Sequence, residues 1–138
     1  MADTFQLEIA TAERLLVNEQ VTRAEIPGKE GYMGILAGHA PLLSTLGAGV
    51  LTYESGRGSQ VIAIAGGFVE VFDNHVSVLA DYAQFAADIQ ADRAKQDLEQ
   101  ANEVLKKAQN EAEANAALKA VQRAQAYLDA ASRASVAH

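Results

Sequence analysis

Hydrophobic and polar positions alternate along the first part of the chain. Within residues 5–9, and again within 22–26, apolar or weakly polar residues alternate with strongly polar ones. A period of two is typical of strands with one buried face. The run 61–65 is apolar throughout, which predicts a strand covered on both of its faces.

Turn signals separate these segments at short intervals. Asp73 and Asn74 lie between the apolar segments 68–72 and 75–79, and both residue types tolerate the positive φ of a tight hairpin. Closely spaced strands with no helical pattern between them predict an antiparallel sandwich or barrel.

Beyond residue 86 the spacing of apolar residues changes to three and four, which is typical of helices packed along a seam. The turn between two such helices is predicted at Gln109-Asn110-Glu111 and Asn115, where the apolar pattern is interrupted. The predicted seam residues are Ala94, Leu98, Ala101, Leu105 and Ala108 in the first helix and Leu118, Val121, Gln125 and Leu128 in the second.

Composition changes at the same place. All ten glycines and both prolines lie at or before Gly67, whereas 17 of the last 53 residues are alanine. Strands and turns favour the first composition and helices the second. The chain is therefore predicted to be α+β, with an antiparallel β-sandwich over 1–86 and an antiparallel two-helix hairpin over 87–138.

The alanine-rich seam also bears on how the hairpin is held. A buried alanine contributes far less than the roughly 1.5–3 kcal/mol of a buried leucine. We therefore expect a weakly docked hairpin that opens without unfolding the sandwich. The alternative is a permanently docked hairpin.

Charge and length exclude several classes of protein. The net charge of −7 over 138 residues argues against nucleic acid as a partner. The absence of cysteine excludes disulfides and thiolate metal sites. Residues 1–10 lack the features of a secretory signal, and the apolar run 61–69 is far shorter than the roughly 20 residues that span a bilayer. The chain is expected to be soluble and cytoplasmic.

Candidate catalytic chemistry is sparse. Among the three histidines, His39, His75 and His138, no two have metal-ligand spacing, and the sequence holds no nucleophile elbow or phosphate loop. The glycine pairs in 47–49 and 56–58 are interpreted as turn residues. No catalytic residue and no metal site is predicted, and the chain is expected not to be an enzyme.

The most informative segment is 30–43, where three glycines and a proline stand among apolar residues. This composition describes backbone that passes through tight turns. From the residues alone, His39 is either a buried structural histidine or part of a binding surface. A second segment, 65–72, places two glycines in a strand and predicts a bulge or a close backbone approach.

These two segments, followed by the alanine-rich tail, resemble the epsilon subunit of bacterial F-type ATP synthase over essentially the whole chain. The resemblance rests on Gly34-Ile-Leu-Ala-Gly-His-Ala-Pro-Leu-Leu43, on Gly66-Gly-Phe-Val-Glu-Val71 and on Val78-Leu-Ala-Asp81. It implies a flattened sandwich of about ten strands. It also implies a central-stalk subunit without catalysis of its own, coupling proton translocation to ATP synthesis and restraining ATP hydrolysis.

The resemblance further implies partners and a location. The sandwich would bind the gamma subunit through the face around His39, and the loop at Glu30 would reach the ring of c subunits. The subunit would lie at the cytoplasmic face of the plasma membrane, touching the membrane only through the complex. The interface residues implied in this way are Glu30, Gly31, Tyr32, Met33, His39 and Pro41.

The family's helical tail is a regulatory arm that extends to block hydrolysis. Basic residues of its second helix then meet an acidic segment of the beta subunit. The matching residues are Lys119, Arg123 and Arg133. The alternative is an ordinary solvated helix face.

Some members of the family bind ATP through an Ile/Leu-Asp-x-x-Arg-Ala motif. Here Ile89 and Arg93 match, but Gln90 replaces the aspartate, and an amide cannot act as a carboxylate acceptor. Asp92 lies about 200° round a helix from that position. We expect weak ATP binding or none, and therefore no cofactor.

A different class of function is left open by the residues. The chain could be a free-standing ligand-binding sandwich with a coiled-coil oligomerisation tail. A homotrimer or homotetramer with bound ligand would favour this alternative, and a monomer that captures gamma would favour the stalk subunit.

Overall fold

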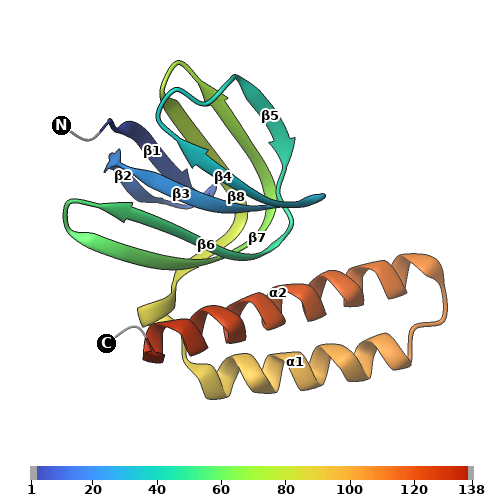
Figure 1. The fold of residues 1–138 in the computed structure, drawn as a ribbon. Helices are drawn as coiled ribbons and strands as arrows, with labels where there is room; N and C mark the ends of the chain where they lie inside the picture. Colours follow the sequence, from blue (N-terminus) through green and yellow to red (C-terminus); the bar gives the residue numbers. More distant parts are fainter. Residues whose placement is uncertain (1–2, 137–138) are drawn as a thin grey trace.

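The computed structural model describes residues 3–136, which form a β-sandwich followed by two helices (Figure 1). The eight strands are β1 (Phe5–Ala10), β2 (Leu15–Val21), β3 (Arg23–Gly28), β4 (Gly31–Leu36), β5 (Leu42–Thr45), β6 (Ala48–Ser55), β7 (Gly58–Phe72) and β8 (His75–Phe85). A short 3-10 helix, η1 (Ala86–Asp88), leads into α1 (Ala91–Lys106) and α2 (Glu111–Val136). The predicted α+β class is confirmed.

The strands are hydrogen-bonded in the order β2-β1-β8-β7-β6-β3-β4, and β5 pairs with β7 off this path. The long strand β7 serves two parts of the sheet, since 58–65 pairs with β6 and 68–71 with β5. Residues 3–136 form eight strands, roughly the ten that were expected, and β7 and β8 are the longest of them. At the middle of β7 both Gly66 and Gly67 have positive φ, of 73° and 107°.

The register of β7 with β8 is the same on both sides of these glycines, so they do not form a bulge. A Cβ on Gly67 would instead overlap the carbonyl oxygen of Leu79. Of the two expectations for segment 65–72, the close backbone approach is therefore the correct one.

One strand pair differs from the antiparallel arrangement that was expected. Strand β1 pairs with β8 in parallel, from Gln6 opposite His75 to Ala10 opposite Leu79. A parallel pair needs a long connection, and here β2 to β7 supply it. The other strand pairs in the described part of the chain are antiparallel.

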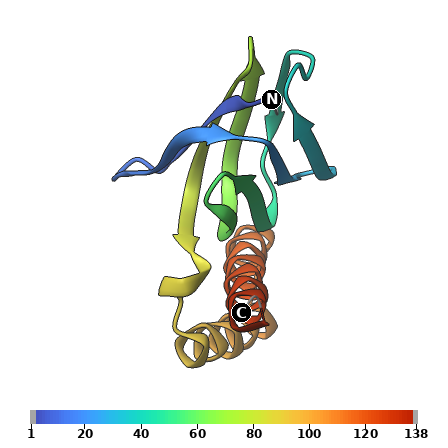
Figure 2. The same cartoon turned by 60° about the vertical axis from the view of Figure 1, so that its left-hand side comes forward.

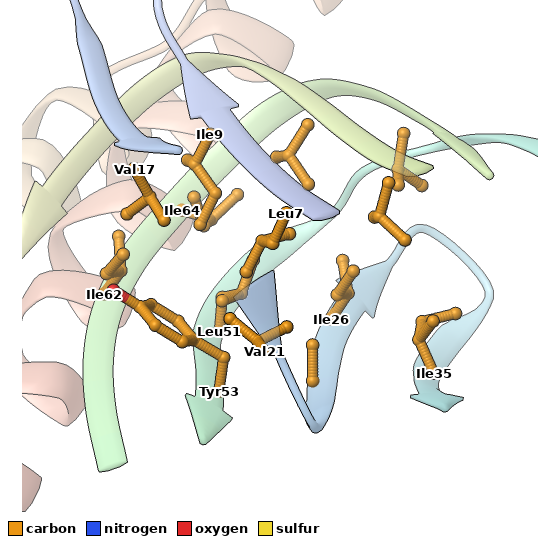
Figure 3. Close-up of a cluster of buried hydrophobic side chains, with 14 of the residues drawn as sticks. Leu7, Ile9, Val17, Val21, Ile26, Ile35, Leu51, Tyr53, Ile62 and Ile64 are labelled. Atoms are coloured by element: carbon orange, nitrogen blue, oxygen red, sulfur yellow. The ribbon is translucent and has the colours of Figure 1, made fainter. Parts of the chain in front are cut away.

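The main core fills the interior of the sandwich with aliphatic side chains, Phe5 and Tyr53 (Figure 3). Phe5, Leu7 and Ile9 all point into it, which confirms the alternation over 5–9. Residues 61–65 of β7 are covered on both faces as predicted. Ile62 and Ile64 face the main core, whereas Ala63 faces a second cluster beneath α2.

The turn between β7 and β8 is the predicted hairpin. Asp73 and Asn74 have φ of 51° and 59°, which is the left-handed conformation that such a tight turn requires. The side chain of Asn74 has a further role in the candidate site described below.

The turn between the helices is shorter than predicted. The Asn110 side chain accepts a hydrogen bond from the Glu113 N–H, and the Glu113 carboxylate accepts one from the Gln109 N–H, each at 2.8 Å. This reciprocal capping starts α2 at Glu111. The prediction that Glu111 and Asn115 lie in the turn was wrong, because both lie within α2.

The seam predicted for the first helix is confirmed, since Ala94 and Ala101 are buried and the other three residues are half-buried. The seam predicted for the second helix is right only in part: Val121 and Leu128 are half-buried, but Leu118 and Gln125 are exposed. Alanine is so frequent in α2 that several faces of the helix have the same spacing. The buried residues of α2 are Ala117, Ala124, Ala126 and Ala130.

Helix α2 lies between the sandwich and α1 (Figures 1 and 2). It meets β6 and β7 through the second cluster, whose buried members are Val50, Ala63, Ala86 and Ala130. Three of these four buried members are alanines. None of the helices in residues 3–136 has the length and apolar character that would let it cross a membrane.

Candidate functional site

Large apolar side chains are exposed together on the outer surface of β5, β7 and β8. Leu43 is 71% exposed and Phe72 is 64% exposed, and Phe68 and Leu79 are nearly half exposed. Phe68 is directly opposite Leu79 across β7 and β8, and Thr45 of β5 is opposite Phe68. We call Leu43, Phe68, Phe72 and Leu79 the apolar face.

The apolar face follows from the alternation of side chains along the strands. Residues at 69 and 71 of β7, and at 76 and 78 of β8, point into the main core. Their sequence neighbours then point outward, and three of these six positions carry Phe68, Phe72 and Leu79. Glu70 points outward as well, opposite Leu43, so one exposed carboxylate lies among the apolar side chains. Large apolar side chains grouped on an exposed surface mark an interaction site more often than scattered ones do.

The glycine–histidine loop, residues 37–41, adjoins this face. Gly38 takes a φ of 82°, and its N–H donates a hydrogen bond to the Asn74 side chain at 2.7 Å. His39 is half-buried, and its Nδ1 lies 2.8 Å from the Ala40 carbonyl oxygen. A fully buried structural histidine, one of the two readings left open, is therefore wrong. Pro41 is exposed.

The other interface residues implied by the resemblance lie at the far end of β4. Glu30 and Gly31 are exposed in the turn between β3 and β4. Tyr32 turns back onto the sandwich, where its hydroxyl accepts a hydrogen bond from the Val50 N–H at 2.9 Å. Met33 is half-buried and packs against the main core.

The six implied residues therefore form two separate groups rather than one site. Strand β4 separates them, and six residues of extended strand span about 17 Å. The group at Glu30 and the group at His39 are placed to meet two different partners, or two regions of one partner.

The two residues of the candidate nucleotide motif are not brought together either. Ile89 lines an apolar groove of about 520 Å³ between η1 and the end of α2. Arg93 lines a different groove, of about 890 Å³ between α1 and α2, and its Nε lies 3.3 Å from the Asp97 carboxylate. Gln90 caps α1 without a side-chain hydrogen bond to the helix.

The three basic residues of the implied inhibitory arm have different surroundings. Lys119 and Arg133 are exposed on α2. Arg123 is half-buried, and its guanidinium carbon lies 4.1 Å from the centre of the Tyr82 ring on β8. The alternative of a solvated helix face is thus wrong for Arg123 in this conformation.

Two further contacts of titratable side chains lie away from these residues, at His75 and at Tyr53. Among residues 3–136 no three His, Asp or Glu side chains are grouped so that they could hold a metal ion. The Nε2 atom of His75 lies 3.0 Å from a carboxylate oxygen of Glu8 on the neighbouring strand. Burial and the Glu19 carboxylate raise the pKa of Tyr53 to about 12.

Sequence reasoning missed the apolar face and the Tyr82 contact. A signal for the apolar face was present, because the even-numbered and the odd-numbered residues of 68–72 are all apolar apart from Glu70. Only one of these two sets can point into the single interior of a sandwich. Nothing in the sequence connects Tyr82 with Arg123.

Comparison with known proteins gives a consistent result. Residues 4–86 match the family model described as "ATP synthase, Delta/Epsilon chain, beta-sandwich domain". An ATP synthase epsilon chain of Solibacter usitatus is 54% identical over 99 residues, which cover 72% of this chain and 74% of that relative. One from Syntrophomonas wolfei is 40% identical over 131 residues, covering 94% and 96%.

Solved structures agree with these relatives. A chain in the structure of the OSCP, F1 and c-ring of the Euglena gracilis mitochondrial ATP synthase has a TM-score of 0.78 and 27% identity, covering 93% of this chain and 81% of that one. A chain of the Tetrahymena thermophila mitochondrial enzyme shares the fold, with a TM-score of 0.66. The chain therefore belongs to the family of ATP synthase delta and epsilon chains.

Proposed function

We propose that this chain is a non-catalytic central-stalk subunit of an F-type ATP synthase, located at the cytoplasmic face of the plasma membrane. Residues 1–86 bind the gamma subunit and the ring of c subunits, and residues 87–138 form a regulatory arm that restrains ATP hydrolysis. The membership in the epsilon chain family supports this role.

The observation that carries the proposal is the apolar face beside the glycine–histidine loop. Four large apolar side chains lie uncovered on a rigid sheet, and Leu43 is the most exposed of them. Aromatic and aliphatic side chains grouped in this way are enriched at the centres of interfaces. We assign this face, together with His39 and Pro41, to the gamma subunit.

The turn at the other end of β4 is assigned to the c-ring. Glu30 and Gly31 are exposed there and present a carboxylate and bare backbone to a partner. Tyr32 and Met33 support the turn from behind, because one bonds to β6 and the other packs against the core.

Two observations support the expectation of weak ATP binding or none. Arg93 is already engaged by the Asp97 carboxylate. Ile89 lines a different groove from Arg93, so the two motif residues do not face one ligand in this conformation. The alternative of a ligand-binding sandwich gains no support, because aliphatic side chains fill the sandwich interior.

A binding experiment tests the assignment of the apolar face. Leu43→Asp puts a charge at the most exposed position of the face, and Gln60→Asp adds the same charge at the exposed far end of β7. We expect Leu43→Asp to weaken binding to the catalytic sector lacking this subunit by about tenfold or more. Gln60→Asp should bind like the parent chain. Equal binding by Leu43→Asp and the parent chain would contradict the assignment.

A further inference from the structure

The contact between the helices and the sandwich is made by α2. Along its length, the residues that meet the strands or the second cluster are Arg123, Ala126, Tyr127, Ala130 and Ala134. We call these five residues the docking face of α2. Three of the five are alanines. Such short side chains bury little apolar area, and they do little to fix the position of α2 along the strands.

Arg123 is the one long cationic side chain of the docking face. Its guanidinium lies over the ring of Tyr82, with 4.1 Å between the guanidinium carbon and the ring centre. A planar guanidinium stacks on an aromatic face in a way that a lysine ammonium cannot reproduce. Tyr82 is opposite Ala65 in the β8–β7 register, so its backbone belongs to a central pair of strands.

A second tyrosine, on α2 itself, is influenced by the charge of the same guanidinium. Tyr127 follows Arg123 by one helical turn and is half-buried at the edge of the second cluster. Burial raises the pKa of Tyr127, while the charge of Arg123 acts in the opposite direction. The charge of Arg123 therefore acts on Tyr127 of α2, and its guanidinium stacks on Tyr82 of β8.

We infer that Tyr82 is the docking site for Arg123, and that this single contact holds α2 in register against the sandwich. The alanines of the docking face supply close packing, and the Arg123–Tyr82 stack supplies specificity. The contact also makes Arg123 unavailable to any acidic partner while α2 is docked. This last consequence rests on the proposed regulatory function, whereas the docking contact itself does not.

Hydrogen exchange of the full-length chain tests the docking contact. Tyr82→Leu keeps apolar bulk but removes the π face, and Arg123→Gln removes the guanidinium. Each is expected to speed amide exchange in α1 and α2 about two- to fivefold. Strands β1 and β3 should keep their exchange rates, which shows that the sandwich remains folded.

Matched variants control for loss of bulk and loss of charge. Tyr82→Phe keeps the ring, and Lys95→Gln removes a charge from the exposed side of α1. Both should exchange like the parent chain. The double variant Tyr82→Leu/Arg123→Gln should exchange no faster than either single variant, because both remove one interaction.

Two results would overturn the inference. One is unchanged exchange in the helices of Arg123→Gln, a variant that leaves the sandwich sequence intact. The other is a double variant whose increase in helix exchange equals the sum of the two single increases. Effects of independent sites add, whereas two substitutions that remove the same contact have the effect of one.

A separate measurement addresses the regulatory consequence. With the catalytic sector lacking this subunit, Tyr82→Leu should restrain ATP hydrolysis at roughly two- to fivefold lower concentration than the parent chain. Arg123→Gln should show no such gain, because it loses the basic group together with the docking contact. If the exchange results hold but the parent chain and both variants leave hydrolysis unchanged, the contact stands and the proposed regulatory function is wrong.

Discussion

The Asn74 side chain accepts a hydrogen bond from the backbone N–H of Gly38 at 2.7 Å. Asn74 belongs to the β7–β8 turn and Gly38 to the glycine–histidine loop, so a contact between distant parts of the sequence fixes the loop beside the apolar face. The Asn74 carbonyl also accepts a bond from the Gln6 N–H at 2.9 Å. This one residue therefore ties β1, the loop and the hairpin together.

Asn74→Gly should loosen the glycine–histidine loop while it leaves the hairpin intact. Glycine tolerates the φ of 59° at this position and removes only the amide side chain. We expect faster amide exchange at residues 38–40 and gamma binding that is weaker by roughly threefold to tenfold. Unchanged exchange of the Gly38 amide would show that the bond does not hold the loop.

Gly67→Ala should be strongly destabilising. The new Cβ would overlap the Leu79 carbonyl oxygen, and φ is 107°, which alanine adopts only with strain. We expect a loss of at least about 2 kcal/mol of unfolding free energy in urea titrations. Gly56→Ala is the matched control, because nothing lies within 4 Å of its Cβ position. Similar losses in the two variants would contradict the close approach.

Tyr53 should make stability sensitive to alkaline pH. Its side chain is buried, its hydroxyl donates to the Glu19 carboxylate at 3.3 Å, and burial and this carboxylate raise its pKa from 10 to about 12. The unfolded chain ionises above pH 10 while the folded chain stays neutral. The stabilisation is thus complete below pH 10 and lost as the pH rises towards 12, by roughly 2–3 kcal/mol.

Urea titrations between pH 9 and pH 12 check this expectation. Tyr53→Phe cannot ionise, so its unfolding free energy should fall less steeply over this range than that of the parent chain. Parallel curves for the two proteins would show that the Tyr53 pKa is ordinary.

The fold could be predicted closely where one physical rule acts alone. The strand over 5–9, the two-sided burial of 61–65 and the turn at Asp73-Asn74 follow from local pattern and turn chemistry. The packing face of α2 could not be predicted in this way. Ala126 and Ala130 are buried there, while Leu118 is exposed, and the many alanines of α2 give several faces of the helix the same spacing.

The candidate site was predictable only in part. The segment around His39 drew attention through its glycines and proline, and the structure places it beside an apolar surface. Leu43 and Tyr82 gave no such signal, and the only signal for Phe72 was the apolar character of residues 68–72. Their exposure and contacts depend on which strands become neighbours, and long-range pairing is not encoded in local periodicity.

The central claim is that the sandwich binds and the hairpin regulates. The most direct test compares the full chain with residues 1–87 for affinity to the catalytic sector lacking this subunit, with ATP hydrolysis measured on the same samples. We expect the two affinities to agree within about threefold and hydrolysis to be restrained by the full chain only. Cooperative unfolding of residues 1–87 would first show that the truncated chain is folded. If this folded chain then bound the catalytic sector more than about tenfold more weakly than the full chain, or restrained hydrolysis as strongly as the full chain, the claim would be contradicted.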